Sequence, residues 1–599
     1  MVSCDLWAIP GGLADRVAQL VLEEPASSHL GREQIVLSAS HTHNSPGNFS
    51  TSPFYTEYAS CQTGFDCHLF EFLARQIANT IIQAIQKKGQ AAIYRREMAL
   101  EGISRNRSLE AFLLNPEAEQ VLAQRHQIEM GNSNLKTSSD IYKAVDPVLT
   151  VLSIESLASQ KPIAVAAFFS VHLTTMGPKT EVYTSDLFGV ASVLAEQRIG
   201  VQYNIDAPVV AIFNGAEGDV SPDWESQDRR NTLRLGEKLA KSIMELIQEK
   251  GKREEGRISW QFSLVPLADQ TFHDKNGRAC RTASKPIVGA PVIGGAEDGR
   301  SALYDLGWKE GITRKRTSDQ GSKQKALNPW HLPISDTIID FLTPSIYPPE
   351  IAPIGLYKIG DMAFATLPGE FTTVLGRRIK MSLQDRLNGS ASVLLLGLSN
   401  EYISYFTTPE EYDAQHYEGA STLYGPESGL LIETNLIQLA DNISKKSPKQ
   451  RASNYCYDYG SREEFGLHNI GAEPTRYDDG LANILQDLKT GYPYRNYPYF
   501  IWEDDILPTW GQESFAGIAL TPCVSIEVKQ QDDTWKTLKI QGIEETDKGL
   551  DFVTIALSVS ENKSKWCAIW MKPVELEQNI SIRFCVIGLD GKKRIQNTK

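Results

Sequence analysis

Apolar runs alternate with amphipathic stretches from Met1 to about residue 440, and this alternation limits the fold more than any other feature of the chain. Residues 68–88 and 231–250 carry apolar side chains at every third or fourth position, which predicts two long helices. The shorter apolar runs between such stretches are typical of buried strands. We therefore predict that residues 1–440 form a large α/β (α+β) domain in which helices cover sheets.

Length and composition limit the class of protein further. A chain of 599 residues is too long for a single ordinary core, so we expect one large domain and one small one. The chain is 41% hydrophobic and 22% charged, as is usual for a soluble globular protein, and its net charge of −14 argues against nucleic acid as a partner. No run approaches about 18 consecutive apolar residues, so we predict no membrane-spanning helix.

The character of the chain changes after residue 440. Residues 441–505 are polar at first and end in a cluster of tyrosines, and we expect a connecting region there. Residues 506–599 contain two runs in which apolar side chains alternate with other residues, which predicts strands and a small all-β sandwich. These alternating positions are Val553, Ile555, Leu557 and Val559 in one run and Ile580, Ile582 and Phe584 in the other.

A long segment inside the first domain lacks any periodicity. Residues 269–349 are rich in Gly, Pro, Lys and Ser, and such long loops in compact domains are usually functional or disordered. We expect this loop excursion to form part of the wall of a substrate groove. The eight cysteines contain no Cys-x-x-Cys pair, and Cys61 and Cys67 could pair across a short loop or stay free.

The stretch 38–47, which contains His41 and His43, follows directly on the apolar run 35–37. Two histidines at positions i and i+2 of a strand end point to the same side, so both imidazoles can reach one point in space. That geometry suits a metal site or an acid–base site. An isolated pair of this kind is more often a surface or hydrogen-bonded core feature, so the rest of the chain has to supply its partners.

Other apolar runs also end in side chains that suit a metal or a reaction centre. They lead to His172, to Ser221, to Glu370, and to Tyr402 and Tyr405. Each has another explanation by itself, because a lone histidine is often a core residue and Ser221 or Glu370 could cap a helix. Ligand sites of open α/β sheets gather at strand ends, so we expect these side chains to converge. Imidazoles, a carboxylate and phenols together suit Zn²⁺ with one position open for water.

Five ordered motifs resemble those of the neutral ceramidase family, and their order and approximate spacing match from about Val2 to Leu439. This match is far more specific than a lone His-x-His pair. The C-terminal residues match only loosely, in the manner of the family's immunoglobulin-like domain. The motifs are Leu37–Gly47, Asn106–Ser108, Gly218–Pro222, Pro368–Thr373 with Gly376–Arg378, and Tyr412 through Tyr417–Thr422.

The resemblance implies a zinc ion with four protein ligands and three residues that contact the substrate amide. The family's tyrosine ligand is the second one of its Asn-x-Tyr-x-x-Tyr pattern, which selects Tyr405 over Tyr402. Ser221 matches a serine once proposed as the family's nucleophile. The implied ligands are His41, His172, Glu370 and Tyr405, and the implied substrate contacts are His43, Arg107 and Tyr417.

These positions predict the hydrolysis of an amide. Zinc lowers the pKa of water towards about 7, so a nucleophile is available at neutral pH. His43 would act as general base and then deliver a proton to the amine, while Arg107 and Tyr417 would donate hydrogen bonds to the developing oxyanion. A serine nucleophile is then not required, so we interpret Ser221 as a positioning residue and expect Ser221→Ala to retain hydrolysis that His41→Ala abolishes.

The chain departs from the family pattern in three places. Asn44–Asn48 replaces the family's Ser-Gly-Pro-Gly-Gly, which would reshape the pocket wall, and Asp223 stands where an asparagine is common. Family members begin before the segment that matches Val2–Leu6, so we expect Met1 to be an internal start and the chain to be truncated at its N-terminus. The localisation stays open, although the family resemblance leans towards a secreted or cell-surface protein.

The leading hypothesis is a zinc-dependent ceramidase that acts on ceramide or a related N-acyl sphingoid lipid, with peripheral membrane contact as a further expectation. One alternative keeps the zinc site and changes the substrate to another lipid acyl amide or ester. A metallo-β-lactamase type fits less well, because Ser45 and Pro46 stand where its Asp-His continuation belongs. The last alternative is an inactive truncated homologue that acts as a binding module.

Overall fold

The computed structural model describes residues 1–58, 64–131, 139–178, 180, 183–206, 208–315, 319–326, 348–387, 389, 391–449, 498–504, 524–540, 542–547, 551–559, 564–570, 580–588 and 592–597. The chain divides into two compact units. The first comprises residues 1–63, 77–180 and 185–467, and the second comprises residues 64–76, 181–184 and 468–599. Most of the predicted connecting region 441–505 lies outside the described residues, and so does Cys61, one of the two cysteines that could pair or stay free.

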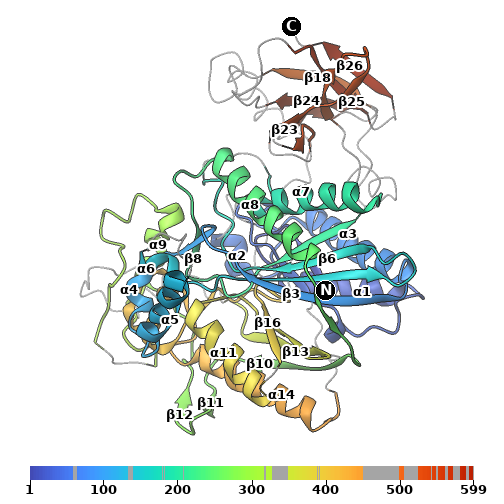
Figure 1. Cartoon of the computed structure of the whole chain (residues 1–599). Coiled ribbons are helices and arrows are strands. Elements are labelled where there is room, and N and C mark those ends of the chain that lie inside the picture. The colour runs from blue at the N-terminus through green and yellow to red at the C-terminus, as the bar shows by residue number, and fades with distance from the viewer. Residues whose placement is uncertain are drawn as a thin grey trace. The chain divides into compact units, whose positions relative to one another are not determined.

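Two mixed sheets form the centre of the first unit (Figure 1). One has the strand order β7-β6-β5-β3-β9 and the other β10-β13-β14-β16. Each sheet contains one parallel pair, β6 with β7 and β14 with β16, and its other pairs are antiparallel. The strands of the first sheet are β3 (Ala91–Ala99), β5 (Val148–Ser156), β6 (Pro162–Phe168), β7 (Val209–Phe213) and β9 (Lys252–Glu254), and those of the second are β10 (Ser259–Pro266), β13 (Ile351–Ile359), β14 (Met362–Thr366) and β16 (Ser392–Leu396).

The two sheets pack face to face, and the two-residue period of their strands explains how. In β14, Met362 and Phe364 point into a core shared with the other sheet, whereas Ala363 and Ala365 point into the core under the helices. Phe364 is 2% exposed, and its ring centroid lies 5.9 Å from that of Phe168 in β6. A strand buried on both faces is apolar throughout, which is why these strands appear as unbroken apolar runs in the sequence.

Helices cover the outer face of each sheet, as Figure 1 shows. α7 (Asp186–Tyr203) and α8 (Arg229–Gln248) pack together over the first sheet, while α11 (Thr373–Arg386) and α14 (Ser428–Ser444) pack over the second. The first unit thus has four layers, and the predicted mixed α/β class is confirmed. The predicted helices 68–88 and 231–250 correspond to α3 (Cys67–Gln86) and α8, and the Asp228 carboxylate caps α8 by accepting the Asn231 N–H at 2.9 Å.

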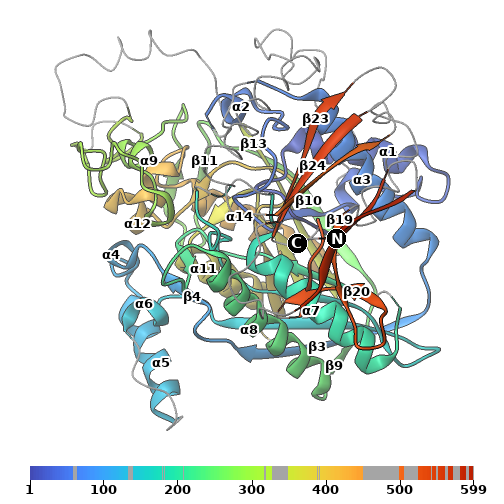
Figure 2. The ribbon, with the colours of Figure 1, turned by 90° about the horizontal axis from the view of Figure 1, so that it is seen from above.

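Further small sheets and helices complete the first unit, and Figure 2 shows several of them in another view. The small sheets pair β1 (Val2–Cys4) with β2 (Leu37–Ala39), β4 (Ser104–Asn106) with β8 (Val220–Pro222), and β15 (Glu370–Phe371) with β17 (Tyr405–Phe406). The remaining helices are α1 (Gly11–Glu23), η1 (Arg32–Gln34), α2 (Pro53–Tyr58), α4 (Leu109–Phe112), α5 (Ala118–Gly131), α6 (Asp140–Lys143), α12 (Pro409–Ala414) and α13 (Tyr417–Ser421).

The predicted excursion 269–349 contains short elements where it is described. These are the hairpin β11 (Thr271–His273) and β12 (Ala279–Arg281), the helix α9 (Ala290–Gly294) and the single turn η2 (Glu297–Gly299). Residues 316–318 and 327–347 lie outside the described residues. The prediction that the excursion lines a lipid groove therefore stays a prediction.

The described elements between residues 499 and 597 are all strands. Sheet β18-β24-β23 and sheet β20-β19-β25-β26 share one core, to which Trp502, Ile526, Trp570 and Phe584 contribute. The described part of this region is thus all-β, as the sequence predicts. The strands are β18 (Tyr499–Asp504), β19 (Val524–Lys529), β20 (Trp535–Thr537), β21 (Lys539–Ile540), β22 (Ile543–Glu544), β23 (Phe552–Val559), β24 (Ser564–Trp570), β25 (Ile582–Ile587) and β26 (Lys593–Asn597).

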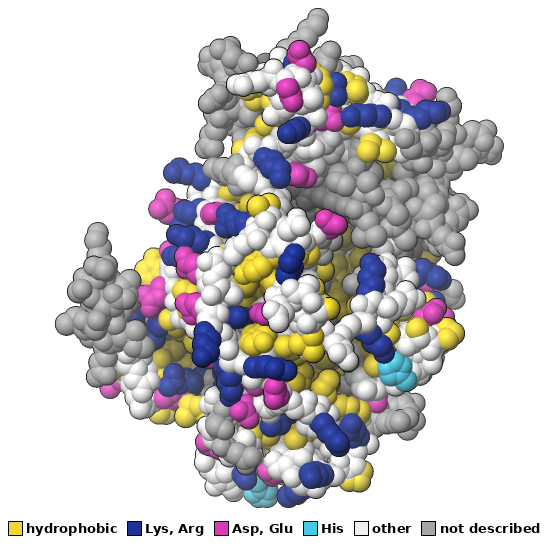
Figure 3. Space-filling model, turned by 45° about the vertical axis from the view of Figure 1, so that its right-hand side comes forward, with side chains coloured by type: hydrophobic (Ala, Val, Ile, Leu, Met, Phe, Trp, Pro, Cys, Tyr) yellow, Lys and Arg dark blue, Asp and Glu magenta, His cyan; other side chains and the backbone are white. Residues whose placement is uncertain are grey.

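Among the described helices, none combines the length and the apolar character that a membrane crossing requires. On the face shown in Figure 3, basic and acidic side chains are interspersed, with apolar side chains visible between them.

The packing between the two sheets generates a stability prediction. Phe364→Ala should lower the free energy of unfolding by about 3–5 kcal/mol, because it leaves a cavity between two sheets that cannot close around it. Val201→Ala in α7, where the side chain is 86% exposed, should change that free energy by less than about 0.5 kcal/mol. Chemical denaturation of both variants checks this, and equal effects would contradict the inter-sheet role of Phe364.

Candidate metal and active site

Residues that follow four separate strands meet at one place in the first unit. His41 follows β2, His172 follows β6, Glu370 lies four residues beyond β14, and Tyr405 lies beyond β16. Glu370 and Tyr405 are paired residues in the parallel register of β15 and β17. The two central sheets therefore both contribute to the same site, as the sequence predicts from its strand ends.

The imidazoles of His41 and His172 are each held by one ring nitrogen. His41 Nδ1 lies 2.6 Å from the carbonyl oxygen of Trp7, and His172 Nδ1 lies 2.8 Å from that of Glu217 and 3.1 Å from that of Val220. A carbonyl accepts only, so Nδ1 carries the proton in both rings and Nε2 is left with a lone pair. Histidine ligands of metals are commonly fixed in this way.

The two Nε2 atoms face the Glu370 carboxylate. His41 Nε2 lies 3.4 Å from Oε1, His172 Nε2 lies 2.8 Å from Oε2, and the Tyr402 hydroxyl donates to Oε1 at 2.6 Å. Burial alone would raise the pKa of Glu370, but positive charge and donated protons at His41 and His172 would outweigh it and hold that pKa well below its usual value. The carboxylate is 1% exposed, and its Oε2 has no hydrogen-bond donor among the described residues.

His43 lies beside these groups and differs from them in exposure. Its Nε2 is 3.3 Å from His41 Nε2, and its side chain reaches solvent. Desolvation within the site lowers the pKa of His43 to about 3, so the ring is neutral at pH 7. Ligand atoms of His41, His43 and His172 all lie within 4.8 Å of one another, a spacing that could hold a metal ion.

The donor set fits a divalent metal ion. Two imidazole lone pairs and a buried carboxylate oxygen without a donor point towards one another, which is costly unless a cation lies between them. Nitrogen and carboxylate donors in this number suit Zn²⁺. His41, His172 and Glu370 are able to hold it, with the Tyr405 hydroxyl 3.3 Å from His172 Nε2 as a fourth donor.

Arg107 holds the Tyr405 oxygen from the other side. One Nη2 hydrogen bond reaches the Tyr405 hydroxyl at 3.0 Å and another reaches the Gly218 carbonyl at 2.7 Å. Nε donates to Glu418 at 2.8 Å, and Nη1 lies 3.2 Å from Asp298. Burial would lower the pKa of Arg107, but these anionic neighbours raise it well above its usual value, so the guanidinium stays charged.

Tyr417 lies at the start of α13, where its half-buried ring meets Tyr405 edge-on at 5.6 Å between centroids. The Arg107 guanidinium carbon lies 5.7 Å from the centre of the same ring. Burial raises the pKa of Tyr417 to about 12, so its hydroxyl keeps its proton and can donate. Tyr417 and His43 are the more open of the predicted site residues, since His41, His172, Ser221, Glu370 and Tyr405 are buried.

Ser221 is fully buried in β8 and donates to Asp298 Oδ1 at 2.6 Å. The serine hydroxyl is therefore engaged with a carboxylate that also pairs with Arg107. The sequence singled out Ser221 and Arg107, but it gave no signal for Asp298, which comes from the aperiodic excursion. The resemblance selects Tyr405 over Tyr402 as a ligand, and in the structure the Tyr402 hydroxyl donates a hydrogen bond to Glu370, a contact that the sequence did not indicate.

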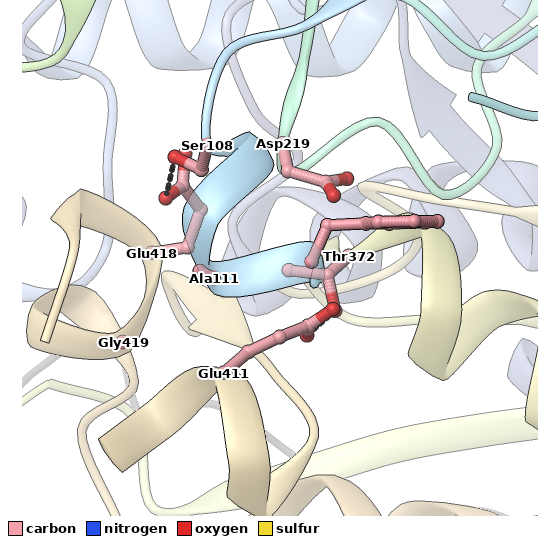
Figure 4. Close-up of a pocket in the computed structure, with 8 residues that line it drawn as sticks. Ser108, Ala111, Asp219, Thr372, Glu411, Glu418 and Gly419 are labelled. Carbon is pink, nitrogen blue, oxygen red and sulfur yellow. Dashed lines mark hydrogen bonds between the residues drawn. The ribbon is translucent and has the colours of Figure 1, made fainter. Parts of the chain in front are cut away.

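Three buried carboxylates, those of Asp219, Glu411 and Glu418, line one pocket (Figure 4). Asp219 accepts from Asn106 and Thr373, Glu411 accepts from Asn115 and Thr408, and Glu418 accepts from Ser108. Burial raises the pKa of Asp219 to about 6 and that of Glu411 to about 8. Protein donors already satisfy these carboxylates, so they support the position of Arg107 and α4. They differ in this from Glu370 Oε2, which has no donor among the described residues.

The backbone around the site adopts strained conformations. His41, Asn400 and Ser404 have positive φ values of 71°, 66° and 58°, which such residues rarely adopt. Gly369 has a φ of 151°, and a Cβ there would lie 2.4 Å from the Ser404 carbonyl oxygen. Strain at these positions is held by the surrounding structure and aims the neighbouring side chains at one point.

The fold and the site define a mixed α/β protein with a three-histidine cluster able to hold a metal ion. The chain belongs to the neutral/alkaline non-lysosomal ceramidase family, because the model of that family's N-terminal domain matches residues 1–232 and 225–430. The resemblance seen in the five motifs is thereby confirmed.

Curated relatives agree with this assignment. Neutral ceramidase A of Dictyostelium discoideum is 25% identical over 513 residues, covering 77% of this chain and 68% of its own. Neutral ceramidase B of the same organism is 27% identical over 66% of this chain and 58% of its own, and the neutral ceramidase of Pseudomonas aeruginosa is 27% identical over 70% of this chain and 61% of its own. The matches thus span about three fifths to two thirds of these relatives.

Solved structures show the same fold. The crystal structure of the neutral ceramidase from Pseudomonas aeruginosa matches with a TM-score of 0.67 at 19% identity, covering 99% of this chain and 89% of that one. A structure described as ceramidase complexed with C2 matches with a TM-score of 0.70 at 20% identity over the same shares of the two chains.

The close approach at Gly369 gives a prediction on backbone strain. Gly369→Ala should destabilise the protein by more than Gly277→Ala, because both add a side chain at positive φ but only the first also collides with a carbonyl oxygen. Gly277, with a φ of 81° and no neighbouring atom within 4 Å, isolates the conformational effect of about 1–2 kcal/mol. Denaturant midpoints of the two variants compare them, and equal losses would argue against the collision.

Proposed function

We propose that this protein is a zinc-dependent ceramidase that hydrolyses the N-acyl amide bond of ceramide to a sphingoid base and a fatty acid. The observation that carries the proposal is the convergence of His41, His172 and Glu370 with a carboxylate oxygen that has no donor among the described residues. Membership of the ceramidase family supports the choice of reaction, and the relative described as complexed with C2 supports a ligand of this kind.

The metal site would supply the nucleophile. Zn²⁺ held by His41, His172, Glu370 and Tyr405 would polarise the amide carbonyl and lower the pKa of water to about 7. Arg107 assists Tyr405 in this role, since a guanidinium 3.0 Å from the phenol oxygen favours the ionised form that binds a cation. Burial and the Glu370 charge raise the pKa of Tyr405 well above its usual value in the absence of such a cation.

His43 is the proton carrier in this proposal. The imidazole is neutral at pH 7, stands 3.3 Å from a ligand nitrogen and is open to solvent, so it can accept a proton from water at the site. The same ring can then protonate the departing amine, which leaves poorly without a proton. An alternative arrangement uses His43 as a third histidine ligand, and the spacing of the cluster is compatible with both.

Arg107 and Tyr417 would stabilise the negative charge that develops on the carbonyl oxygen. Both keep their protons at neutral pH, and both lie beside Tyr405. Fixed donors of this kind act most strongly where water is excluded. Ser221 would contribute as a positioning residue, because it is buried and already donates to Asp298.

The C-terminal unit would be an immunoglobulin-like sandwich that does not take part in the chemistry. Its two antiparallel sheets with a shared apolar core support that topology. Peripheral contact with a membrane, which a lipid substrate would favour, stays a prediction.

An assay tests the function directly. Purified protein should release fatty acid from fluorescent ceramide at neutral pH, lose that activity with a strong chelator, and regain it when Zn²⁺ is returned. Metal analysis should give one zinc per chain. If the protein hydrolyses another lipid amide or ester and does not turn over ceramide, the alternative substrate class is correct. Activity that survives complete metal removal would reject the zinc mechanism.

The different roles proposed for His41 and His43 give a second test. His41→Ala should lose both zinc and activity, because it removes a ligand, whereas His43→Ala should keep its zinc and lose at least about 100-fold in kcat as a missing general base. Ser221→Ala should keep measurable hydrolysis. Loss of zinc from His43→Ala would instead identify His43 as a ligand.

A further inference from the structure

Asp298 has a buried carboxylate and belongs to the aperiodic excursion 269–349. It lies in the single turn η2 and is 7% exposed. Its Oδ1 accepts from the Ser221 hydroxyl at 2.6 Å, and its Oδ2 accepts from the Thr174 hydroxyl at 2.9 Å and lies 3.2 Å from Arg107 Nη1. Three elements that are distant in sequence, β8, the segment after β6 and the Arg107 loop, therefore meet at one side chain.

The backbone of η2 is anchored as well. The Gln227 side-chain amide donates to the Asp298 carbonyl at 2.8 Å and to the Thr174 carbonyl at 3.0 Å. The turn that carries Asp298 is thus anchored to the segment after β6 that contains Thr174. Burial would raise the pKa of Asp298, but the Arg107 charge and the hydrogen bonds from Ser221 and Thr174 lower that pKa and outweigh burial, so the group is ionised at neutral pH.

An ionised carboxylate only accepts, so Ser221 and Thr174 must both direct their hydrogens towards it. The Ser221 hydroxyl is then neither free to donate elsewhere nor placed to attack a substrate. Arg107 uses Nε for Glu418, both Nη2 hydrogens for Gly218 and Tyr405, and one Nη1 hydrogen for Asp298. Of the five N–H hydrogens of Arg107, one on Nη1 therefore has no acceptor among the described residues. The contact with Asp298 fixes the direction in which this hydrogen points.

We propose that Asp298 is a positioning residue of the hydrolase, which Ser221 and Thr174 hold in place and which in turn aims Arg107 at the substrate carbonyl. This inference rests on the proposed function. It gives Ser221 a role that needs no nucleophilic chemistry, and it gives the excursion a defined part in the site.

The experiment compares Asp298→Asn with Glu297→Gln in the full chain. Glu297 is the preceding residue of the same turn, and its carboxylate pairs with Arg105, whose guanidinium lies over the Trp224 ring at 5.0 Å. Asp298→Asn should lower kcat for ceramide by about 10- to 100-fold with unchanged zinc content, the range seen when a residue that supports a site is lost. Glu297→Gln should stay within about threefold of wild type.

A double-mutant cycle separates positioning from loss of folded protein. If Ser221 acts through Asp298, adding Ser221→Ala to Asp298→Asn should cause little further loss, whereas independent effects would multiply. Multiplying effects, or an Asp298→Asn variant with wild-type kcat, would overturn the proposal, while a wild-type protein without ceramide turnover would reject the proposed function instead. If Asp298→Asn does not fold, Thr174→Val replaces it in the same cycle, because it removes one donor and leaves the charge in place.

Discussion

The buried Glu370 carboxylate between two imidazole nitrogens is the interaction on which the rest of the site depends. Two lone pairs and an anion in a dry environment repel one another unless a cation or protons lie between them. Every neighbouring feature keeps them together in spite of this. Backbone carbonyls fix the proton on the far nitrogen of His41 and His172, Tyr402 holds one oxygen of Glu370, and the tight turn at Gly369 leaves no room for relaxation.

The architecture explains how a chain of this length brings such residues together. Each central sheet contains one parallel pair of strands, and the residues that follow those pairs meet at one end of the two-sheet core. The charged groups alternate in sign with increasing distance from Glu370. Arg107 lies next, beside Tyr405, and Glu418 and Asp298 lie behind it. This alternation of sign keeps buried charges paired.

Much of this was predictable from the sequence because it depends on local patterns. The apolar period of residues 231–250 predicts α8, and the unbroken apolar runs predict strands covered on both faces. The convergence of His41, His172 and Glu370 was expected because each comes three or four residues after such a run. Asp298 could not be predicted, since it lies in a segment without periodicity and owes its role to contacts with residues 77 and 191 positions away in the sequence. The hydrogen bond from Tyr402 to Glu370 could not be predicted either, because Tyr402 and Tyr405 are three positions apart and the sequence does not show which of them contacts the carboxylate.

The face-to-face packing of the sheets has a consequence for how the protein matures. His172 follows β6 of one central sheet, whereas Glu370 follows β14 and Tyr405 follows β16 of the other, so this set of donors is complete only when the two sheets have packed together. Binding of a cation by the assembled set and closure of the inter-sheet core are then thermodynamically linked, and each strengthens the other. A bound ion would therefore stabilise the packing between the two sheets in addition to its chemical role. Its loss would weaken that packing.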